Sequence, residues 1–405
     1  MKTLCTLLLA LLTFSARTIR AATYYLGAPG NSAALQALVD QAVAGDIIVL
    51  RTGDHYLTTP IRLPVGKDGL TIRGEAGAVV RKAPNTYNAA AFEISGNSNV
   101  LDLLDLDGGN LPEAGIIIYG QRNTVSNSKV HNCGSEVARG AGILLHSSGN
   151  PVCALNTIVG CSVYYNYMVG ISQNGHSDGT IRDNKIYENG AEGLTIDIRS
   201  HNNYVYNNWI HFNNTGDRGV GGVGIDFANG NRLDNNTIDF TRFRSGLTFQ
   251  NNIGGCDGTL VSNNRINNNE GYGILERWTQ FRNINTGFQN NELLNNRRGA
   301  QTIIYSDAEL LATAPTTHLA AAELELSPNP AQEFVALKLG AGLGGAASLS
   351  IQDLQGRVVY RRALAGGRPA ETVRLQSAQL PGAGLYSVTI QTPTAITTKK
   401  LIMAR

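Results

Sequence analysis

The chain has 405 residues, with 33 lysines and arginines against 31 aspartates and glutamates, so its formal net charge is +2 at pH 7. A guide of roughly 150 residues per domain predicts two or three units, and a hydrophobic content of 42% argues against disorder throughout. Because no basic surplus is available to neutralise phosphates, we expect no nucleic-acid partner.

The first residues have the pattern of a secretory signal peptide. Lys2 supplies a positive charge, a leucine-rich run follows over residues 4–14, and small residues appear at Ala21 and Ala22. Eleven residues are too few to cross a bilayer, since a helical span needs roughly 20. We therefore predict a cleaved signal over residues 1–22 and no transmembrane segment in the mature chain.

Two sequence markers repeat through the middle of the chain. One is an apolar residue shortly after Asn, Asp or Ser, and the other is a glycine followed closely by an apolar residue. The first occurs at Val130, Val163, Ile186, Ile210, Ile238, Ile266 and Leu293. The second occurs at Gly115, Gly142, Gly170, Gly193, Gly224, Gly246 and Gly273. Two markers with similar spacing indicate a structural repeat of 22 to 33 residues.

Each repeat contains short segments in which apolar and polar residues alternate, as in residues 181–186. Such alternation is typical of strands, and no unit has helical periodicity. One unit is too small to bury its apolar face alone, so equivalent strands should stack in parallel as a solenoid. Residues 97–296 contain 35 asparagines, which we expect at equivalent turns and in side-chain ladders between turns.

These features resemble the right-handed parallel β-helix proteins, a superfamily that includes pectate lyases, polygalacturonases, alginate and chondroitin lyases and mannuronan epimerases. The resemblance extends to the start of the domain, with a capping helix expected over 33–42 and strand motifs at 45–50, 53–56 and 70–74. It implies an all-β fold, a solenoid over residues 23–304. The fold hosts many functions, so it specifies the substrate weakly.

The composition changes after residue 301, where short alternating strands such as 334–339 predict a small β-sandwich. This part resembles the C-terminal sorting domain of the type IX secretion system of Bacteroidota. The resemblance rests on three motifs, at residues 326–330, 353–357 and 399–402. It implies a linker over 305–322, an immunoglobulin-like sorting domain over 323–405, the type IX machinery as a partner, and a secreted or cell-surface protein exported across both membranes.

Four cysteines remain after removal of the signal: Cys133, Cys153, Cys161 and Cys256. In an exported protein they allow three disulfide pairings, and the sequence leaves open whether they are paired or are buried thiols. Their spacing matches no zinc site, so we predict no metal ligands among them.

Alternate side chains of a strand point to opposite faces, so aligning the repeats on the glycine marker predicts one outward polar column. Its members are Tyr119, His146, Asn174, Asp197, Asp226, Gln250 and Arg277. His176 and Arg199 lie two residues beyond two of these strands, and Trp278 follows Arg277. Residues 213–222 form a longer connection that carries Arg218, and we expect it to make a wall of the binding groove.

Two aspartates of this column are the candidate catalytic pair. Asp197 and Asp226 are expected on successive turns, displaced by two residues and therefore on the order of 8 Å apart. This separation would leave room for a water molecule, as inverting glycoside hydrolysis requires. A lyase would instead use His146 and Arg199 on an acidic sugar, with Ca²⁺ between the aspartates. The predicted substrate-binding residues are Tyr119, Asn174, His176, Arg218, Gln250, Arg277 and Trp278.

The leading hypothesis is an exported protein that cleaves a polysaccharide, with a hydrolase favoured slightly over a lyase. The sequence requires no cofactor, although calcium is compatible with it. The main alternative is a non-catalytic surface β-helix that binds glycans or acts as an adhesin. A third hypothesis is a periplasmic repeat protein that acts in copper-enzyme maturation. The sorting motifs argue against this hypothesis.

Overall fold

The structure is a computed structural model that divides into two compact units, Met1–Glu309 and Leu310–Arg405. It describes residues 21–83, 89–110, 114–136, 140–147, 153–252, 254–278, 281, 283–305, 324–339, 347–353, 358–364, 371–391 and 396–404. The signal segment up to residue 20 and the predicted linker from residue 306 lie outside these residues.

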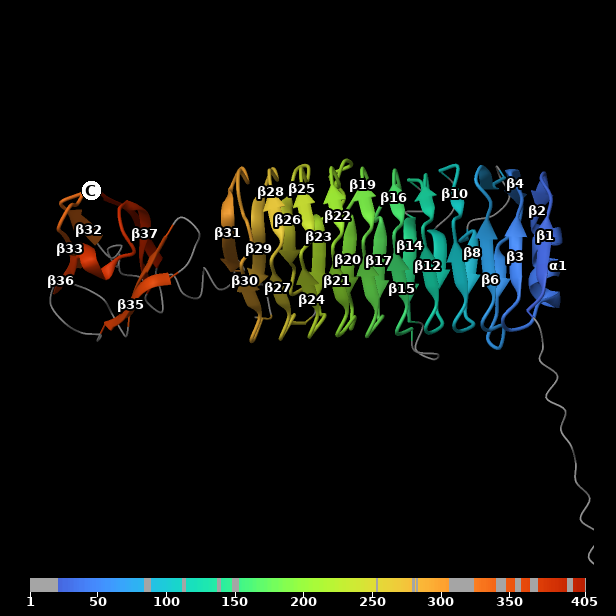
Figure 1. Ribbon diagram of the computed structural model, residues 1–405, viewed down its shortest axis with the longest axis horizontal. Helices are drawn as coiled ribbons and strands as arrows, with labels where there is room; N and C mark the ends of the chain where they lie inside the picture. The colour runs from blue at the N-terminus through green and yellow to red at the C-terminus, as the bar shows by residue number, and fades with distance from the viewer. Residues whose placement is uncertain are drawn as a thin grey trace, which may run out of the picture. The chain divides into compact units, whose positions relative to one another are not determined.

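Three parallel sheets build the first unit (Figure 1). Sheet A comprises β1 (Thr23–Leu26), β3 (Ile47–Leu50), β6 (Thr71–Gly74), β9 (Val100–Asp102), β12 (Thr124–Ser126), β15 (Thr157–Val159), β18 (Thr180–Arg182), β21 (Tyr204–Tyr206), β24 (Arg232–Asp234), β27 (Leu260–Ser262) and β30 (Gly287–Gln289). Sheet B comprises β2 (Gly30–Asn31), β4 (Gly53–Leu57), β7 (Ala78–Lys82), β10 (Asp105–Asp107), β13 (Lys129–His131), β16 (Ser162–Tyr164), β19 (Lys185–Tyr187), β22 (Trp209–His211), β25 (Thr237–Asp239) and β28 (Arg265–Asn267). Sheet C comprises β5 (Ile61–Leu63), β8 (Phe92–Ile94), β11 (Ala114–Ile118), β14 (Ala141–His146), β17 (Ile171–Asn174), β20 (Leu194–Asp197), β23 (Gly221–Asp226), β26 (Ser245–Phe249), β29 (Tyr272–Trp278) and β31 (Gly299–Tyr305).

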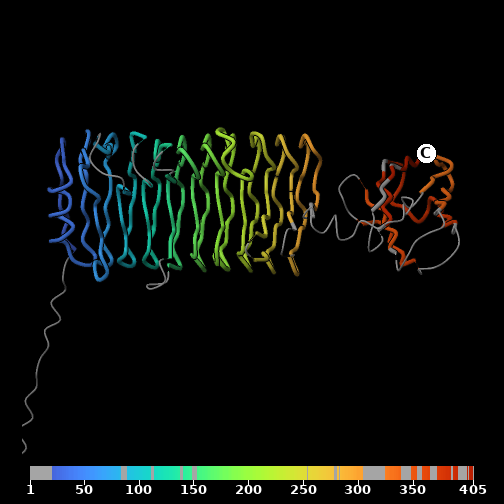
Figure 2. The backbone as a smooth tube through the Cα atoms, turned by 180° about the vertical axis from the view of Figure 1, so that it is seen from behind, coloured from blue at the N-terminus to red at the C-terminus, as the bar shows by residue number. Residues whose placement is uncertain are grey.

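Successive coils of the chain stack so that each strand pairs in parallel with its equivalent in the next coil (Figure 2). In sheet C, for example, Ile143 pairs with Ile171, which pairs with Leu194. The predicted parallel β-solenoid is therefore confirmed. Every described strand of this unit belongs to one of the three sheets, because stacking gives each strand inside a sheet two hydrogen-bonded neighbours that it could not obtain alone.

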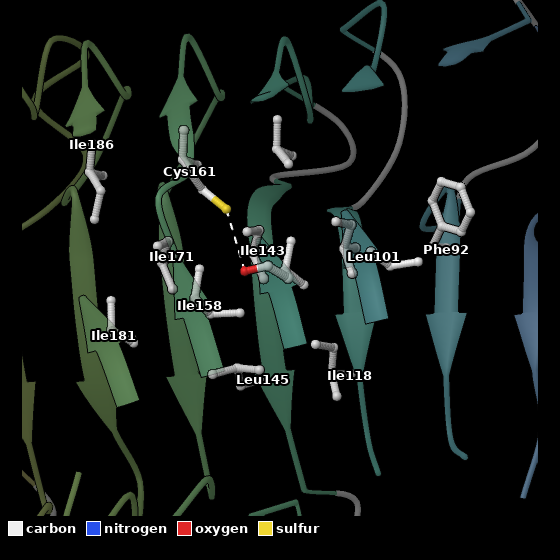
Figure 3. Close-up of a cluster of buried hydrophobic side chains, with 14 of the residues drawn as sticks. Phe92, Leu101, Ile118, Ile143, Leu145, Ile158, Cys161, Ile171, Ile181 and Ile186 are labelled. Atoms are coloured by element: carbon white, nitrogen blue, oxygen red, sulfur yellow. Dashed lines mark hydrogen bonds between the residues drawn. The ribbon is translucent and has the colours of Figure 1, made fainter. Parts of the chain in front are cut away.

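The core is a column of aliphatic side chains enclosed by the three sheets (Figure 3). In sheets A and B the central residue of the three-residue strands points inward, and Val125, Ile158 and Ile181 are completely buried. Burial of each such side chain contributes roughly 1.5–3 kcal/mol. Ile143 and Ile171 of sheet C are equally buried, as the predicted register requires.

The helix α1 (Ser32–Gln41) covers the N-terminal end of this core, as predicted. Asn31 caps it, because its side-chain oxygen accepts a hydrogen bond from the Ala34 N–H at 2.9 Å. Leu35 and Val39 are buried against the first coil. No helix within the described part of the chain is both long and apolar enough to span a membrane.

Buried asparagines form ladders at the turns, which confirms the expectation from composition. In one ladder the Asn208 N–H donates to Asn236 Oδ1 at 3.0 Å, and the Asn208 amide donates to the Ile181 carbonyl at 2.9 Å. Asn184 and Asn264 repeat this arrangement on other coils. Each side chain thus satisfies backbone groups that the turn removes from the sheets.

The four described cysteines are buried free thiols rather than disulfides. Cys161 points into the core (Figure 3) and donates a hydrogen bond to the Val125 carbonyl at 3.5 Å. Burial raises the pKa of this thiol to about 12. At neutral pH it is therefore protonated and acts as a small apolar side chain.

The second unit consists of two antiparallel sheets, consistent with a β-sandwich. One contains β32 (Leu324–Ser327), β33 (Phe334–Leu339) and β36 (Glu371–Gln376); the other contains β34 (Ala347–Gln352), β35 (Val358–Leu364), β37 (Gly384–Gln391) and β38 (Ile396–Met403). A short helix, η1 (Ser377–Gln379), precedes β37. Leu337, Ile351, Val388 and Leu401 are buried together between the sheets.

Two of the motifs that predicted the sorting domain meet in this unit. The Asn329 side-chain oxygen accepts a hydrogen bond from the Ile402 N–H at 2.9 Å. The segment before β33 is thereby attached to the last strand. Residues 354–357 of the third motif lie outside the described residues.

Candidate active site on sheet C

The strand register of sheet C brings the predicted polar residues into one outward column. His146 pairs with Asn174, Asn174 with Asp197, and Asp197 with Asp226. The same register continues through β26 and β29 to Gln250 and Arg277. Residues far apart in the sequence therefore share one face of the solenoid.

The predicted displacement of the two aspartates is wrong. Leu194 pairs with Val223, so the glycine equivalent to Gly193 is Gly222 and not Gly224. Asp197 and Asp226 are consequently Cα partners on neighbouring strands, whose backbones lie about 4.8 Å apart. Ala228 lies beyond the end of β23, after Phe227 with its φ of +50°, and is buried in the core.

Asp197 is a carboxyl group in a desolvated site. Burial, together with the charges of Glu192 and Asp226, raises its pKa to about 8, although a hydrogen bond with Thr195 opposes the shift. Its Oδ1 atom is buried and has no hydrogen-bond partner among the described residues. At neutral pH this group therefore holds a proton, which a general acid requires.

Asp226 is 9% exposed, so it is more buried than expected for a member of the outward column. Its Oδ1 accepts a hydrogen bond from the Asn252 N–H at 3.0 Å. The Asn252 amide in turn donates to Gln250 at 2.7 Å. A backbone donor stabilises a charged carboxylate, so the two neighbouring aspartates have different environments.

Glu192 is a third carboxyl group of the site, and it was missed by the sequence analysis. It is 6% exposed, and its Oε1 accepts a hydrogen bond from the Val220 N–H at 2.6 Å. Burial raises its pKa. A Cβ atom added at Gly219 would lie 2.5 Å from the Glu192 carboxyl carbon, so glycine at this position leaves room for the Glu192 carboxyl group.

A sequence signal for Glu192 did exist. It stands immediately before the repeat glycine, where other coils have uncharged residues such as Ala114, Ala141 and Ser245. Glu192 is thus a charged residue at a repeat position that other coils fill with small or apolar residues, and this difference could have identified it.

The longer connection at residues 213–222 folds onto the outer face of sheet C. The Thr248 hydroxyl donates to the Val220 carbonyl at 2.9 Å, which ties this connection to β26. Arg218 lies over the Tyr167 ring, with 4.1 Å between its guanidinium carbon and the ring centroid. Gly219 and Val220 line a cavity of about 310 Å³.

That cavity extends along β29 and includes Arg277, one of the predicted binding residues. Arg244, Arg298, Phe243 and Tyr272 also line it. The strand register places Arg277 two coils from Asp226. The side chain of Trp278 lies outside the described residues.

Tyr119 and His146 are in contact on the N-terminal side of the aspartates. Their ring centroids lie 5.8 Å apart with the planes at 73°. The Nδ1 atom of His146 is buried and has no hydrogen-bond partner among the described residues. Asn174, half-buried, stands between His146 and Asp197 in the column.

His176 is not available for substrate, contrary to the prediction. It is completely buried, and its ring nitrogens contact the Gln173 amide at 2.9 Å and the Asn156 N–H at 3.3 Å. Burial lowers its pKa to about 4, so it stays neutral and structural. Arg199, by contrast, is exposed just beyond β20, with its guanidinium 5.9 Å from the Phe227 ring centroid.

Within the described residues, no group of three or more His, Cys, Asp or Glu side chains is arranged to hold a metal ion. Calcium binding between the aspartates stays a prediction from the sequence.

Comparisons with known proteins agree with this architecture. Residues 86–239 match the family model of the right-handed beta helix region, and residues 325–404 match that of the secretion system C-terminal sorting domain. The first unit is therefore a right-handed parallel β-helix. The chain as a whole joins such a β-helix to a C-terminal sorting domain of the type IX kind, which indicates export. No curated protein sequence matches it significantly.

Several solved structures share the fold at low sequence identity. The ORF18 protein of Geobacillus virus E2 has a TM-score of 0.54 and 11% identity, covering 92% of this chain and 73% of its own. The enzymatically active domain of tailspike protein 2 from bacteriophage CBA120 has a TM-score of 0.51 and 12% identity, covering 95% and 77%. The A-module of a mannuronan C-5 epimerase from Azotobacter vinelandii has a TM-score of 0.49 and 14% identity, covering 67% and 92%. The two structures with TM-scores above 0.5 share the fold alone, so the activity has to be argued from the site.

Proposed function

We propose that this protein is an exported glycoside hydrolase that cleaves a polysaccharide bound along the outer face of sheet C. The observation that carries the proposal is the pair formed by Asp197 and Asp226, adjacent in register. Asp197, with a pKa of about 8, supplies a protonated acid at neutral pH. Asp226 supplies the carboxylate beside it.

The register of the pair supports one mechanism over the other. Retaining glycosidases hold their two carboxyl groups about 5–5.5 Å apart, whereas inverting enzymes need about 6.5–9.5 Å to accommodate a water molecule. Because Asp197 and Asp226 are register partners on neighbouring strands about 4.8 Å apart, we infer that the retaining arrangement fits better than the inverting one first expected. Asp197 would protonate the leaving oxygen while Asp226 attacks the anomeric carbon; Asp197 then deprotonates the water that releases the sugar.

Export is the second part of the proposal. The sorting domain is proposed to direct the chain through the type IX machinery to the cell surface or the medium, where polysaccharides are accessible. A lyase is the second candidate, favoured by the arginines of the cavity that extends along β29, since they would neutralise a sugar carboxylate.

The proposal is tested by incubating the full chain with a panel of plant and algal polysaccharides, with and without a chelator. We expect new reducing ends without absorbance near 232 nm, and NMR of the first product should show retained anomeric configuration. Absorbance at 232 nm would instead identify a lyase, and loss of activity with chelator would show a metal requirement.

Variants of the pair sharpen this test. Asp197→Asn and Asp226→Asn should each lower kcat by at least about 10²-fold, the scale of a lost acid or nucleophile. Asp178→Asn is a matched control, because Asp178 is exposed at a turn outside the column. Glycan binding without cleavage by the unmodified protein would favour the non-catalytic alternative.

A further inference from the structure

The cavity beside the candidate active site contains an excess of positive charge. Three arginines line it, Arg244, Arg277 and Arg298. Arg244 is paired with Asp217 at 2.9 Å and also donates to the Gly219 carbonyl at 3.3 Å. Arg277 and Arg298 form no ion pair with any residue that the structure describes. Two guanidinium groups are therefore free to bind an anion.

This charge is local. The whole chain carries a formal net charge of only +2. Beside the cavity, however, Arg242 adds to the three lining arginines, with its guanidinium 5.6 Å from the centroid of the Phe243 ring. Arginine presents a planar set of donors that matches carboxylate and sulfate groups, so this arrangement selects an oxyanion rather than a neutral hydroxyl group.

Two aromatic rings supply a second element of a sugar site. Tyr272 and Phe243 both line the cavity. Phe243 has a φ of +63°, a left-handed conformation that is costly for a bulky residue, and its N–H donates to Glu270 at 2.8 Å. Phe243 is 45% exposed. Aromatic faces pack well against the apolar faces of sugar rings.

The cavity is also placed correctly for a substrate that crosses several coils. Leu275 and Arg277 belong to the outward face of β29, whose register leads through β26 to Asp226 on β23. Its volume of about 310 Å³ lies within the range of small-ligand pockets. A sugar residue held there would belong to the same chain as the sugar at the aspartate pair.

We propose that this cavity is a specificity subsite for a sugar residue that carries a carboxylate or sulfate group, held by Arg277 and Arg298 against the Tyr272 ring. The inference rests on the proposed function, because it makes that function the cleavage of an anionic polysaccharide.

The experiment measures binding without turnover, using the full chain with Asp197→Asn. The probes are three oligosaccharides of equal length: oligogalacturonate, a chondroitin sulfate oligosaccharide and a neutral β-glucan oligosaccharide. The affinity of the protein for each is measured by calorimetry at low and high salt. We expect at least one anionic probe to bind at least tenfold more tightly than the neutral probe, with an affinity that falls as salt rises. Comparison of the two anionic probes identifies the preferred group.

Point variants then locate the binding site. Arg277→Gln and Arg298→Gln should each weaken anionic binding roughly tenfold to a hundredfold, as expected for loss of a charged hydrogen bond. Arg297→Gln is the matched control, since it removes the same charge from the neighbouring residue, which does not line the cavity; its effect should stay below about threefold. Unfolding curves for each variant show whether the fold is intact.

Equal affinity for the neutral and anionic probes would overturn the inference, as would an equal loss in the Arg297→Gln control. Failure of the proposed function looks different. In that case anionic oligosaccharides would bind in the arginine-dependent manner, but no polysaccharide would be cleaved by the unmodified protein.

Discussion

At the scale of the residue, the proposed chemistry depends on two chemically identical side chains, Asp197 and Asp226, that lie in different environments. Asp197 has a buried oxygen without a partner, and its pKa is raised to about 8. Asp226 accepts a backbone hydrogen bond that favours its charged form. Glu192 adds to this difference, because its charge is one of the causes that raise the pKa of Asp197.

The first prediction concerns the stability of the folded state against pH. Asp197 has a raised folded-state pKa, so between about pH 4 and pH 8 the folded chain retains a proton that the unfolded chain releases. Its contribution to the free energy of unfolding is therefore lost as pH rises through this window. Asp197→Asn should remove this dependence and be more stable than the parent protein near pH 8, by a few kcal/mol.

Urea unfolding followed by tryptophan fluorescence would measure this effect. Both tryptophans, Trp209 and Trp278, belong to the β-helix, so the signal reports this unit alone. Parallel pH profiles for the parent and the variant would contradict the prediction.

The second prediction treats Glu192 as a positioning residue. Glu192→Gln removes a negative charge near Asp197, so the pKa of Asp197 should fall by roughly one unit. The alkaline limb of the kcat/KM profile should move to lower pH by the same amount. Carboxyl NMR of Asp197 provides a readout independent of turnover, and Glu188→Gln, at a turn of sheet B, serves as the control. An unmoved titration would contradict the assignment.

At the scale of the element, short strands are stable only because turns and neighbours complete their hydrogen bonds. Three-residue strands such as β18 and β21 gain little alone, and the asparagine ladders close the backbone between them. The same regularity produces outward columns of side chains. Equivalent residues of successive strands are register partners, so their side chains lie next to one another from coil to coil. The 213–222 connection interrupts this regularity and provides the wall of the cavity.

The third prediction tests the ladder. Asn208→Ala removes the amide that donates to the Ile181 carbonyl and the oxygen that accepts from the Asn184 N–H. Leaving these buried groups without partners should lower the free energy of unfolding by about 2–4 kcal/mol. Asn207→Gly removes an exposed neighbouring side chain at a φ of +56° that glycine tolerates, and should cost less than about 1 kcal/mol. Similar losses in both variants would disprove a special role for the buried ladder.

At the scale of the whole molecule, the chain contains two units with separate hydrophobic cores. The β-helix core runs from Leu26 to Ile274, and the C-terminal core begins at Leu324. Catalysis is proposed for the first unit and export for the second. Separate cores imply that each unit can be changed without unfolding the other.

The fourth prediction follows from this separation. Deletion of residues 324–405 should leave the tryptophan-detected unfolding midpoint of the β-helix unchanged, while the protein is retained inside a host that carries the secretion system. Cell fractionation measures the second effect. A truncated protein that still reaches the surface or the medium would contradict the assigned sorting role.

The sequence by itself determined the repeat, the inward apolar positions and the outward column from Tyr119 to Arg277, because strand alternation and a regular period are local properties. It also indicated the sorting domain, through motifs at residues 326–330 and 399–402. It could not decide between Gly222 and Gly224 as the repeat glycine, since both are followed closely by apolar residues.

Only the tertiary structure made that choice, through the pairing of Leu194 with Val223, and it thereby placed Asp197 beside Asp226. The tertiary structure also buries His176 and places the Glu192 carboxylate where it accepts a hydrogen bond from the Val220 N–H. It forms the arginine-lined cavity from residues of separate coils. These features depend on which coil packs against which connection. Desolvation and charge proximity, which set the chemistry of the site, arise from that packing and not from local sequence.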